Sequence, residues 1–520
     1  MTGDGRNLLS ADLSLVHLGA TMNDGQPQPA AAARLPVANF PKQAIVVIHG
    51  MGEQMPMDTI KGFVRAAWET VTGLATDKLP NPTEVWSKPD GRTGSLELRR
   101  ITTRQTIPTQ TFADGVRSDF YEMYWADLSG GSTWNQVQDW IGGLLLRNPF
   151  TRVPRDVFLA WVVLWLIALT VIILSIAAAL PETASIGSVN FWDYPPLRWL
   201  HGYKGWQLGV VVAALGWVAT SFIVPYFGRV VRYTRAKPDN IAARKNIRER
   251  GLALLSELHD KEYARIIVVG HSLGSILAYD LISYFWAQHQ GARIVASGTP
   301  EFDALREIEM ALADPTWPAQ PALEAFRAAQ TKFAHLLRIR PKPVGKAIDT
   351  RWLITDLITL GSPLAHAEFL MAASKQDLEK RQQDREYPMS PPLRELLDPN
   401  YLQAARDAGF PEGTPAKLLA FPFGGNEWQL HHAAPYAAVR WTNIYDPAFL
   451  VVFGDLISGP LAPVFGDGII DRNLRALRRC QSWSFTHTKY WSLPRNTKRV
   501  LVRITELRNA LDLGGQRRSL

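Results

Sequence analysis

A glycine-flanked serine is the sharpest chemical signal in the sequence. Gly270-His271-Ser272-Leu273-Gly274 follows a β-branched run and precedes a segment with helical character. In a strand–turn–helix context, a G-x-S-x-G turn exposes the serine hydroxyl, and its glycines let the chain bend tightly. The backbone N–H of Leu273 would then face the negative charge that develops during attack on a carbonyl. We therefore predict that Ser272 is the nucleophile of an acyl-transfer reaction.

A second glycine turn provides the other donor that such a reaction needs. His49-Gly50-Met51-Gly52 directly follows the apolar run 44–48. Hydrolases with a G-x-S-x-G turn place an HG-type turn at the end of an earlier strand. We assign the second oxyanion donor to the Met51 backbone N–H. His49 is expected to shape the turn rather than to react.

The base and the acid are expected downstream, in the chain order serine, acid, histidine. His487 is the histidine that remains after the last strong acid candidate. Asp446 stands at the end of the apolar run 439–445, which favours it as the acid. Asp455 follows shortly afterwards and stays open as the alternative. Two weaker candidates are Asp467 and Asp471.

Other reactive residue types point to structural roles. Ser362 follows a predicted strand, but Pro363 has no N–H to serve as an oxyanion donor. The pair His431-His432 with Glu427 matches no recognised zinc spacing, so neither a metal nor another cofactor is predicted. The single cysteine, Cys480, excludes an internal disulfide and fits a reducing compartment.

Taken together, these motifs resemble the lipase-like branch of the α/β-hydrolase superfamily. Similar intracellular phospholipases and esterases carry a D-P-[IV]-x-G-P-L-like acid motif and an H-x-x-Y-W base motif. The resemblance implies Asp455 as the acid and His487 as the base, although Leu456 departs from the pattern and keeps Asp446 open. The matching segments are VVIHGMGEQ (46–54), EMYWADL (122–128), IIVVGHSLGSILAYD (266–280), ITLGSPL (358–364), WTNIYD (441–446), GDLISGPL (454–461) and HTKYW (487–491).

Strands that alternate with helices predict an α/β fold with a mostly parallel sheet covered on both faces. Strands are expected at 44–48, 95–103, 120–128, 265–269, 352–360 and 439–445, helices at 241–259 and 275–288, and a strand or short helix at 499–506. The expected organisation is a flexible leader (1–40), a first hydrolase part (41–150), a membrane hairpin (151–235), the main hydrolase part (236–510) and a tail (511–520). Residues 296–350 and 372–436 are expected to be insertions or a helical cap.

Two uncharged apolar runs, 157–180 and 205–228, predict the membrane hairpin. Each run would span about 36 Å as a helix, against a hydrocarbon core of roughly 30 Å. Lys and Arg are frequent before the first run and after the second, whereas the 181–204 loop carries only Arg198 and Lys204. The positive-inside rule therefore predicts an external loop, with the hydrolase domain and both termini in the cytoplasm.

The chain has 520 residues and a net charge of +8. Because the basic residues flank the apolar runs, the charge indicates a membrane surface rather than nucleic acid. We expect a membrane-anchored serine hydrolase acting on lipid acyl esters, such as phospholipids or acylglycerols, through an acyl-enzyme. The alternatives are a non-catalytic membrane scaffold with a hydrolase fold, and an esterase or thioesterase for small soluble substrates.

Overall fold

The computed structural model describes most of residues 41–129 and 238–515, together with one long helix and short pieces between them. Outside the described residues lie 1–40, 516–520, most of 130–154 and 180–237, and shorter gaps such as 52–54, 411–416, 450–452, 479–482 and 495–500. The predicted leader, most of the tail and Cys480 fall in these stretches.

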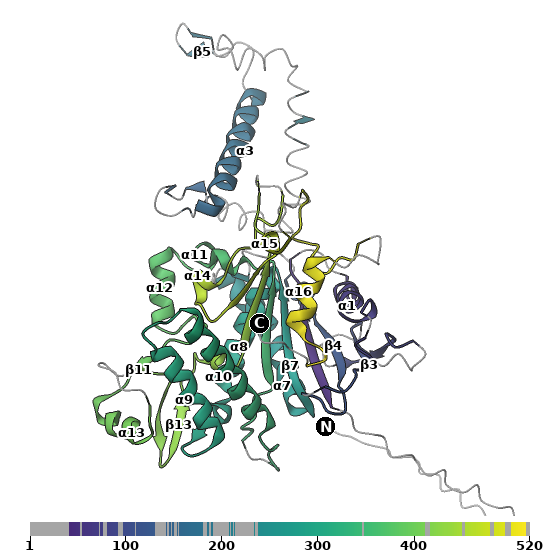
Figure 1. Cartoon of the computed structure of the whole chain (residues 1–520). Helices are drawn as coiled ribbons and strands as arrows, with labels where there is room; N and C mark the ends of the chain where they lie inside the picture. Colours follow the sequence, from purple (N-terminus) through teal and green to yellow (C-terminus); the bar gives the residue numbers. More distant parts are fainter. Residues whose placement is uncertain are drawn as a thin grey trace, which may run out of the picture. The chain divides into compact units, whose positions relative to one another are not determined.

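An eight-stranded sheet forms the centre of the described chain, in the order β15-β14-β9-β7-β1-β4-β3-β2 (Figure 1). The strands from β15 to β4 are mutually parallel, and β3 and β2 continue the sheet in antiparallel fashion. This confirms the predicted α/β class with a mostly parallel sheet. The strands are β1 (Lys42–Ile48), β2 (Val85–Pro89), β3 (Arg99–Gln105), β4 (Arg117–Met123), β7 (Tyr263–His271), β9 (Ile354–Leu360), β14 (Arg440–Tyr445) and β15 (Ile470–Asn473).

Apolar layers cover both faces of the sheet, as the continuous hydrophobic runs of its central strands require. Side chains alternate along β1, so Val46 and Ile48 pack into one cluster and Ile45 and Val47 into the other. The first cluster contains residues of α7 (Pro238–Asp260), α8 (Leu273–Gln288), α9 (Pro300–Ala313) and α10 (Gln320–Ile339). The second contains residues of α1 (Asp58–Val64) and α16 (Val502–Leu511).

Several predicted elements need correction at their ends. The strand expected over 120–128 ends at Met123, and a 3-10 helix, η3 (Ala126–Ser129), follows it. The Trp125 N–H donates to a histidine ring instead of a ladder carbonyl, which fits an end of the strand there. Of the two alternatives for 499–506, a strand or a short helix, the structure confirms the helix, which is α16 and begins at Val502.

The two regions expected to be insertions contain secondary structure of their own. Residues 296–350 hold α9 and α10, as their helical pattern predicted. A small antiparallel sheet links the two regions, because β13 (Glu427–Leu430) pairs with both β12 (Ala420–Gly424) and β8 (Ile294–Ala296). The shorter elements are η1 (Arg65–Glu69), η6 (Gln290–Arg293), η7 (Pro363–His366), α11 (Ala367–Leu370), α12 (Lys375–Gln383), β10 (Glu395–Leu396), η8 (Pro399–Tyr401), α13 (Leu402–Asp407), β11 (Lys417–Leu418), η9 (Pro435–Ala437), α14 (Ala462–Phe465) and α15 (Leu474–Arg478).

The helix α3 (Arg155–Ala179) coincides with the first predicted span, and a short hairpin of β5 (Ser185–Ile186) and β6 (Val189–Asn190) follows it. In the described part of the chain, no helix combines the length and apolar character that crossing a membrane requires. The structure does not support the predicted transmembrane insertion, and most of 205–228 lies outside the described residues. Large exposed apolar side chains on α3 are Phe158, Leu159, Leu166, Ile167, Leu169, Ile172, Ile173 and Ile176.

Candidate active site

Ser272 lies on a sharp turn between β7 and α8. Its backbone has φ 52° and ψ −128°, a conformation that costs a residue with a side chain roughly 1–3 kcal/mol. The flanking glycines are needed for close packing. A Cβ at Gly270 would lie 2.5 Å from the Ser275 Cα, and a Cβ at Gly274 would lie 2.4 Å from the carbonyl oxygens of Ile48 and His49.

A histidine and an aspartate extend from the serine in one hydrogen-bonded chain. The Ser272 Oγ lies 2.9 Å from the His487 Nε2, and the His487 Nδ1 lies 3.0 Å from each carboxylate oxygen of Asp455. An ionised carboxylate only accepts hydrogen bonds, so the Nδ1 carries the imidazole hydrogen. The Nε2 lone pair is then directed at the serine hydroxyl, as a general base requires.

Asp455 is completely buried and held by donors on several sides. The Tyr490 hydroxyl donates to its Oδ2 at 2.7 Å, and the Ile457 N–H donates to its Oδ1 at 2.9 Å. Burial opposes ionisation of Asp455, but the hydrogen bonds from His487, Tyr490 and Ile457 outweigh it and lower its pKa below the ordinary value. The carboxylate is therefore kept ionised beside the imidazole.

The acid and base loops are joined through their backbones. Gly454 donates its N–H to the Ser484 carbonyl at 3.0 Å, and Thr486 donates to the Gly454 carbonyl at 2.9 Å. Because these bonds flank Asp455 and His487, they set the spacing between the two side chains. Gly361, at the end of β9, leaves room for this arrangement, since a Cβ there would lie 2.6 Å from the Tyr490 ring.

Asp446, the acid favoured by its position at a strand end, lies elsewhere. Its Oδ1 accepts a hydrogen bond from the Arg478 Nη2 at 2.5 Å. Its backbone carbonyl accepts the Asp455 N–H at 2.9 Å, so it supports the loop that carries Asp455. The structure thus places Asp455, and not Asp446, against His487. Of the two weaker candidates, Asp467 is exposed and Asp471 binds Asn443.

The predicted oxyanion donors belong to two segments that adjoin Ser272. Leu273 is the first residue of α8, where backbone N–H groups have no partner within the helix. A Cβ at Gly50 would lie 2.7 Å from the Ser272 Cβ, so the turn that carries Met51 packs directly against the nucleophile. Gly52 lies outside the described residues. The two N–H groups therefore belong to segments that meet at Ser272.

His49 stabilises this turn through hydrogen bonds to its backbone and to Trp125. Its Nε2 accepts the Trp125 N–H at 3.2 Å, and its Nδ1 then donates to the Gly50 carbonyl at 2.8 Å. The Trp125 indole N–H donates to the His49 carbonyl at 3.0 Å, and the two rings stack with their planes 3° apart. Both ring nitrogens of His49 are thus engaged in holding the backbone of the turn.

Two neighbours of the triad received no role from the sequence. Tyr490 binds Asp455, and its place three residues after His487 in the H-x-x-Y-W motif was the available signal. The His271 Nε2 donates to the His487 carbonyl at 2.8 Å. Burial, together with the charge of His487, lowers the pKa of His271 to about 3, so it stays neutral near neutral pH. His271 therefore positions the base without competing for its proton.

The rival residues form separate hydrogen bonds. The Ser362 Oγ lies 2.6 Å from the Ser275 Oγ and accepts the Leu364 N–H. The His431 Nε2 donates to the Leu393 carbonyl, and its Nδ1 accepts the Ala433 N–H. Among the described residues, no group of three or more His, Cys, Asp and Glu side chains is arranged to hold a metal ion.

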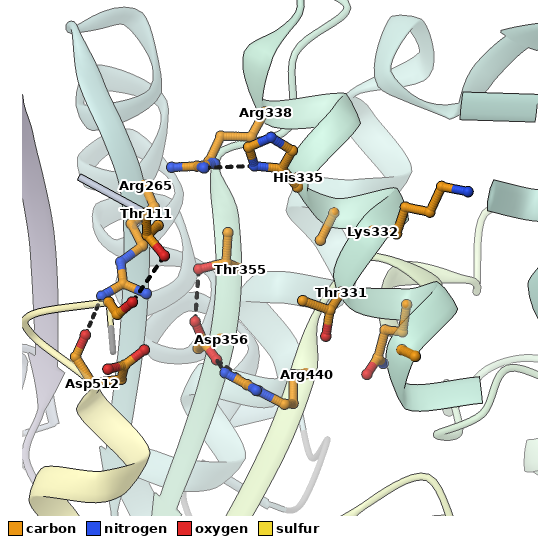
Figure 2. A pocket seen from close by; sticks show the side chains of 14 residues that line it. Thr111, Arg265, Thr331, Lys332, His335, Arg338, Thr355, Asp356, Arg440 and Asp512 are labelled. Atoms are coloured by element: carbon orange, nitrogen blue, oxygen red, sulfur yellow. Dashed lines mark hydrogen bonds and ion pairs between the residues drawn. The ribbon is translucent and has the colours of Figure 1, made fainter. Parts of the chain in front are cut away.

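A cavity of about 460 Å³ lies at the opposite edge of the sheet, where β7, β9 and β14 begin (Figure 2). Arg440 donates to the Asp356 Oδ1 at 2.8 Å. Arg265 donates to the Gln43 side chain at 2.7 Å and to the Asp512 carbonyl at 2.6 Å. The polar groups of this cavity are largely occupied with one another.

The triad side therefore contains a strained serine, a histidine with its lone pair directed at the serine hydroxyl, a buried ionised acid and two adjoining segments that carry the predicted oxyanion donors. Such an arrangement can take up the proton of an attacking hydroxyl and stabilise an oxyanion. No protein-family model, curated protein or solved structure matches the chain at a significant level.

Proposed function

We propose that this protein is a serine hydrolase of carboxylic esters with an α/β-hydrolase fold. One observation carries the proposal: Ser272, His487 and Asp455 form a continuous hydrogen-bonded chain with separations of 2.9 and 3.0 Å. The three residues come from segments far apart in sequence, and each matches the type that its position in a triad requires. The strained backbone at Ser272 adds support, since strain of this kind clusters at active sites.

The residues present define the proposed reaction. His487 takes the Ser272 proton as the Ser272 Oγ forms a bond to the ester carbonyl carbon, and Asp455 stabilises the resulting imidazolium. The backbone N–H groups of Leu273 and Met51 stabilise the oxyanion. The imidazolium then protonates the leaving alcohol, which departs and leaves an acyl group on Ser272. Water, deprotonated by His487, attacks the acyl carbon. The bond from that carbon to the Ser272 Oγ then breaks, the imidazolium returns its proton to Ser272, and the carboxylic acid leaves.

A lipid acyl ester at a membrane surface is the substrate class that we propose. Support comes from the uncharged runs 157–180 and 205–228 and from the row of exposed apolar side chains on α3. Tethering to a bilayer would raise the local concentration of such a substrate. The two-span topology, with the hydrolase domain on the cytoplasmic side, is part of this proposal and rests on the sequence. Retention of the full-length protein in membranes after alkaline washing tests this placement, and release by the wash would contradict it.

Labelling with a fluorophosphonate tests the hydrolase proposal directly. The probe forms a stable bond to a serine only when a neighbouring base activates the hydroxyl. We expect one label per chain, located on Ser272 by peptide mass spectrometry and absent from Ser272→Ala. A folded protein that does not label would favour a non-catalytic scaffold. Faster turnover of short-chain than long-chain esters would instead favour a small soluble substrate.

A further inference from the structure

A second cavity, a groove of about 740 Å³, runs along the outer side of α8. Its walls come from α7, from α8 and from the segment 371–388. None of the triad residues lines it. The groove is therefore a separate site, although α8 begins at the residue directly after Ser272.

Positive charge exceeds negative charge along this groove. Its carboxylates are Glu249, Asp280 and Glu386, and its cations are Arg244, Lys245, Arg248, Arg381 and Arg385. Most of these cations have a carboxylate partner. The pairs are Arg248–Asp280 (2.6 Å), Arg385–Glu395 (2.7 Å), Lys245–Glu249 (3.6 Å) and Arg381–Glu386.

Among the described residues, Arg244 is the cation of this groove that has no carboxylate partner. Its guanidinium lies 5.9 Å from the centre of the Tyr233 ring, an electrostatic contact that leaves its hydrogen-bond donors available. Its Nε is buried and has no hydrogen-bond partner among the described residues. A buried donor without an acceptor costs free energy, and the planar guanidinium fork matches the oxygens of phosphate. Arg244 thus marks a position where an anion would be stabilised.

The rest of the groove suits an apolar chain. Ile241, Leu252, Ile276 and Met371 contribute aliphatic surface to it. Tyr284 adds an aromatic ring that is 44% exposed. A ligand that fills the groove would therefore combine an anionic end with an apolar body.

The position of α7 in the chain favours a lipid as the source of both features. This helix follows the apolar run 205–228 and the basic stretch 229–237, which carries Arg229, Arg232, Arg235 and Lys237. Basic clusters next to apolar segments attract anionic lipid headgroups. We propose that the groove binds an anionic phospholipid, with its phosphate on Arg244 and its acyl chain along the aliphatic wall.

Binding of short-chain lipids to the full-length Ser272→Ala protein in detergent micelles tests this inference. Dihexanoyl phosphatidic acid, dihexanoyl phosphatidylcholine and inorganic phosphate would be titrated by calorimetry. We expect phosphatidic acid to bind at least about tenfold more tightly than either of the others, because only it combines the exposed anion with an apolar body. Equal affinity for inorganic phosphate would overturn the lipid assignment.

Variants at Arg244 test whether phosphatidic acid binds in this groove. Arg244→Gln is expected to weaken binding of phosphatidic acid by about 10- to 100-fold, because a charge-assisted pair is lost. Arg244→Lys keeps the charge but not the planar guanidinium, so we expect a smaller loss of affinity. This variant still tests the site if Arg244→Gln misfolds. Arg306→Gln, on α9 and outside the groove, is the matched control and should bind as the parent does. Unchanged affinity in both Arg244 variants would overturn the site.

The inference does not depend on the proposed hydrolase activity, since the binding is measured in a protein without its nucleophile. A protein that fails to label with a fluorophosphonate could still bind phosphatidic acid through Arg244. Conversely, if the protein is an active hydrolase and its Arg244 variants bind phosphatidic acid normally, only the proposed lipid site in the groove is refuted. The two proposals therefore fail through different measurements.

Discussion

The same three strands, β7, β9 and β14, present buried polar groups at both edges of the sheet, but the two edges differ in what those groups contact. At the carboxyl edge, the Ser272 hydroxyl and the His487 Nε2 point at each other beside a strained turn. At the amino edge, Arg440 and Asp356 form an ion pair in which both side chains are largely buried (Figure 2). Each edge is hydrogen-bonded, yet only one holds a base and a nucleophile in contact.

This difference separates the proposed active site from a structural ion pair. The ion pair and the Arg265 hydrogen bonds at the amino edge satisfy charges that burial would otherwise make costly. At the carboxyl edge, the hydrogen bonds to Asp455 stabilise its negative charge. Asp455 in turn orients His487, whose Nε2 contacts the Ser272 hydroxyl, the oxygen proposed to react. A cavity lined by charged residues is therefore weaker evidence for catalysis than a directed chain of donors and acceptors.

Removing the nucleophile should have the largest effect on the carboxyl edge. Ser272→Ala is expected to lower ester turnover by about 10⁶-fold, because the acyl-enzyme can no longer form. Steady-state hydrolysis, with thermal unfolding as the folding control, measures the change. Turnover equal to that of the unaltered protein would refute the assignment.

Exchanging the acid should produce the next largest effect and test the choice between two aspartates. Asp455→Asn is expected to lower turnover by about 10⁴-fold, because an amide favours the wrong imidazole tautomer. Asp446→Asn should cost far less activity, since Asp446 binds Arg478 and reaches the triad only through its backbone. Steady-state kinetics of the two variants, measured side by side, show which aspartate is the acid. A greater loss in Asp446→Asn would transfer the role of the acid to that residue.

Tyr490 should have a smaller effect, visible mainly in the pH profile. Tyr490→Phe removes the 2.7 Å hydrogen bond to Asp455 and should lower turnover by about tenfold. The ionised acid loses a stabilising donor, so the pKa of Asp455 should rise. Because activity requires ionised Asp455, the acid side of the pH–rate profile should move to higher pH. An unchanged pH–rate profile would show that Tyr490 contributes only packing and does not stabilise the Asp455 charge.

The smallest effect on activity is expected at the amino edge, where stability should change instead. Arg440→Gln removes the cation that is paired with the buried Asp356 carboxylate, so we expect a loss of about 3–5 kcal/mol in the free energy of unfolding. Turnover of the folded fraction should stay within about twofold, because the pair lies at the far edge from Ser272. Denaturant unfolding and kinetics on the same sample measure both quantities. A large loss of turnover in fully folded protein would remove the proposed distinction between the edges.

Local motifs made the contact between Ser272 and His487 predictable from the sequence. The elbow around Ser272 and the H-x-x-Y-W segment after His487 each carry their signal within a few residues. The acid stayed ambiguous for a physical reason. The chain leaves β14 at Asp446 and returns, so that Asp455 donates its N–H to the Asp446 carbonyl and Pro447 pairs with Asp455. A strand-end rule cannot anticipate that return.

The fold was predictable where burial is continuous and less so elsewhere. β1 and β7 are apolar runs buried on both faces, and both were expected from the sequence. β15 has the sequence Ile-Asp-Arg-Asn, which shows no apolar alternation, so its pairing with β14 was not foreseen. The ion pair between Asp356 and Arg440 could not be predicted from the sequence either. The two residues meet because of the parallel register of β9 and β14, which the sequence does not reveal.

The central position of β1 has a consequence for how the chain is made. This strand is enclosed between β4, which follows within the first 123 residues, and β7, which begins at Tyr263. A ribosome adding about 5–20 residues per second needs roughly 10–40 s to pass from the end of β1 to the start of β7. During that interval one edge of a largely apolar strand has no partner from its own sheet. The nascent chain would therefore gain most from a chaperone before β7 emerges. Ser272 directly follows β7, whereas Asp455 and His487 are synthesised much later.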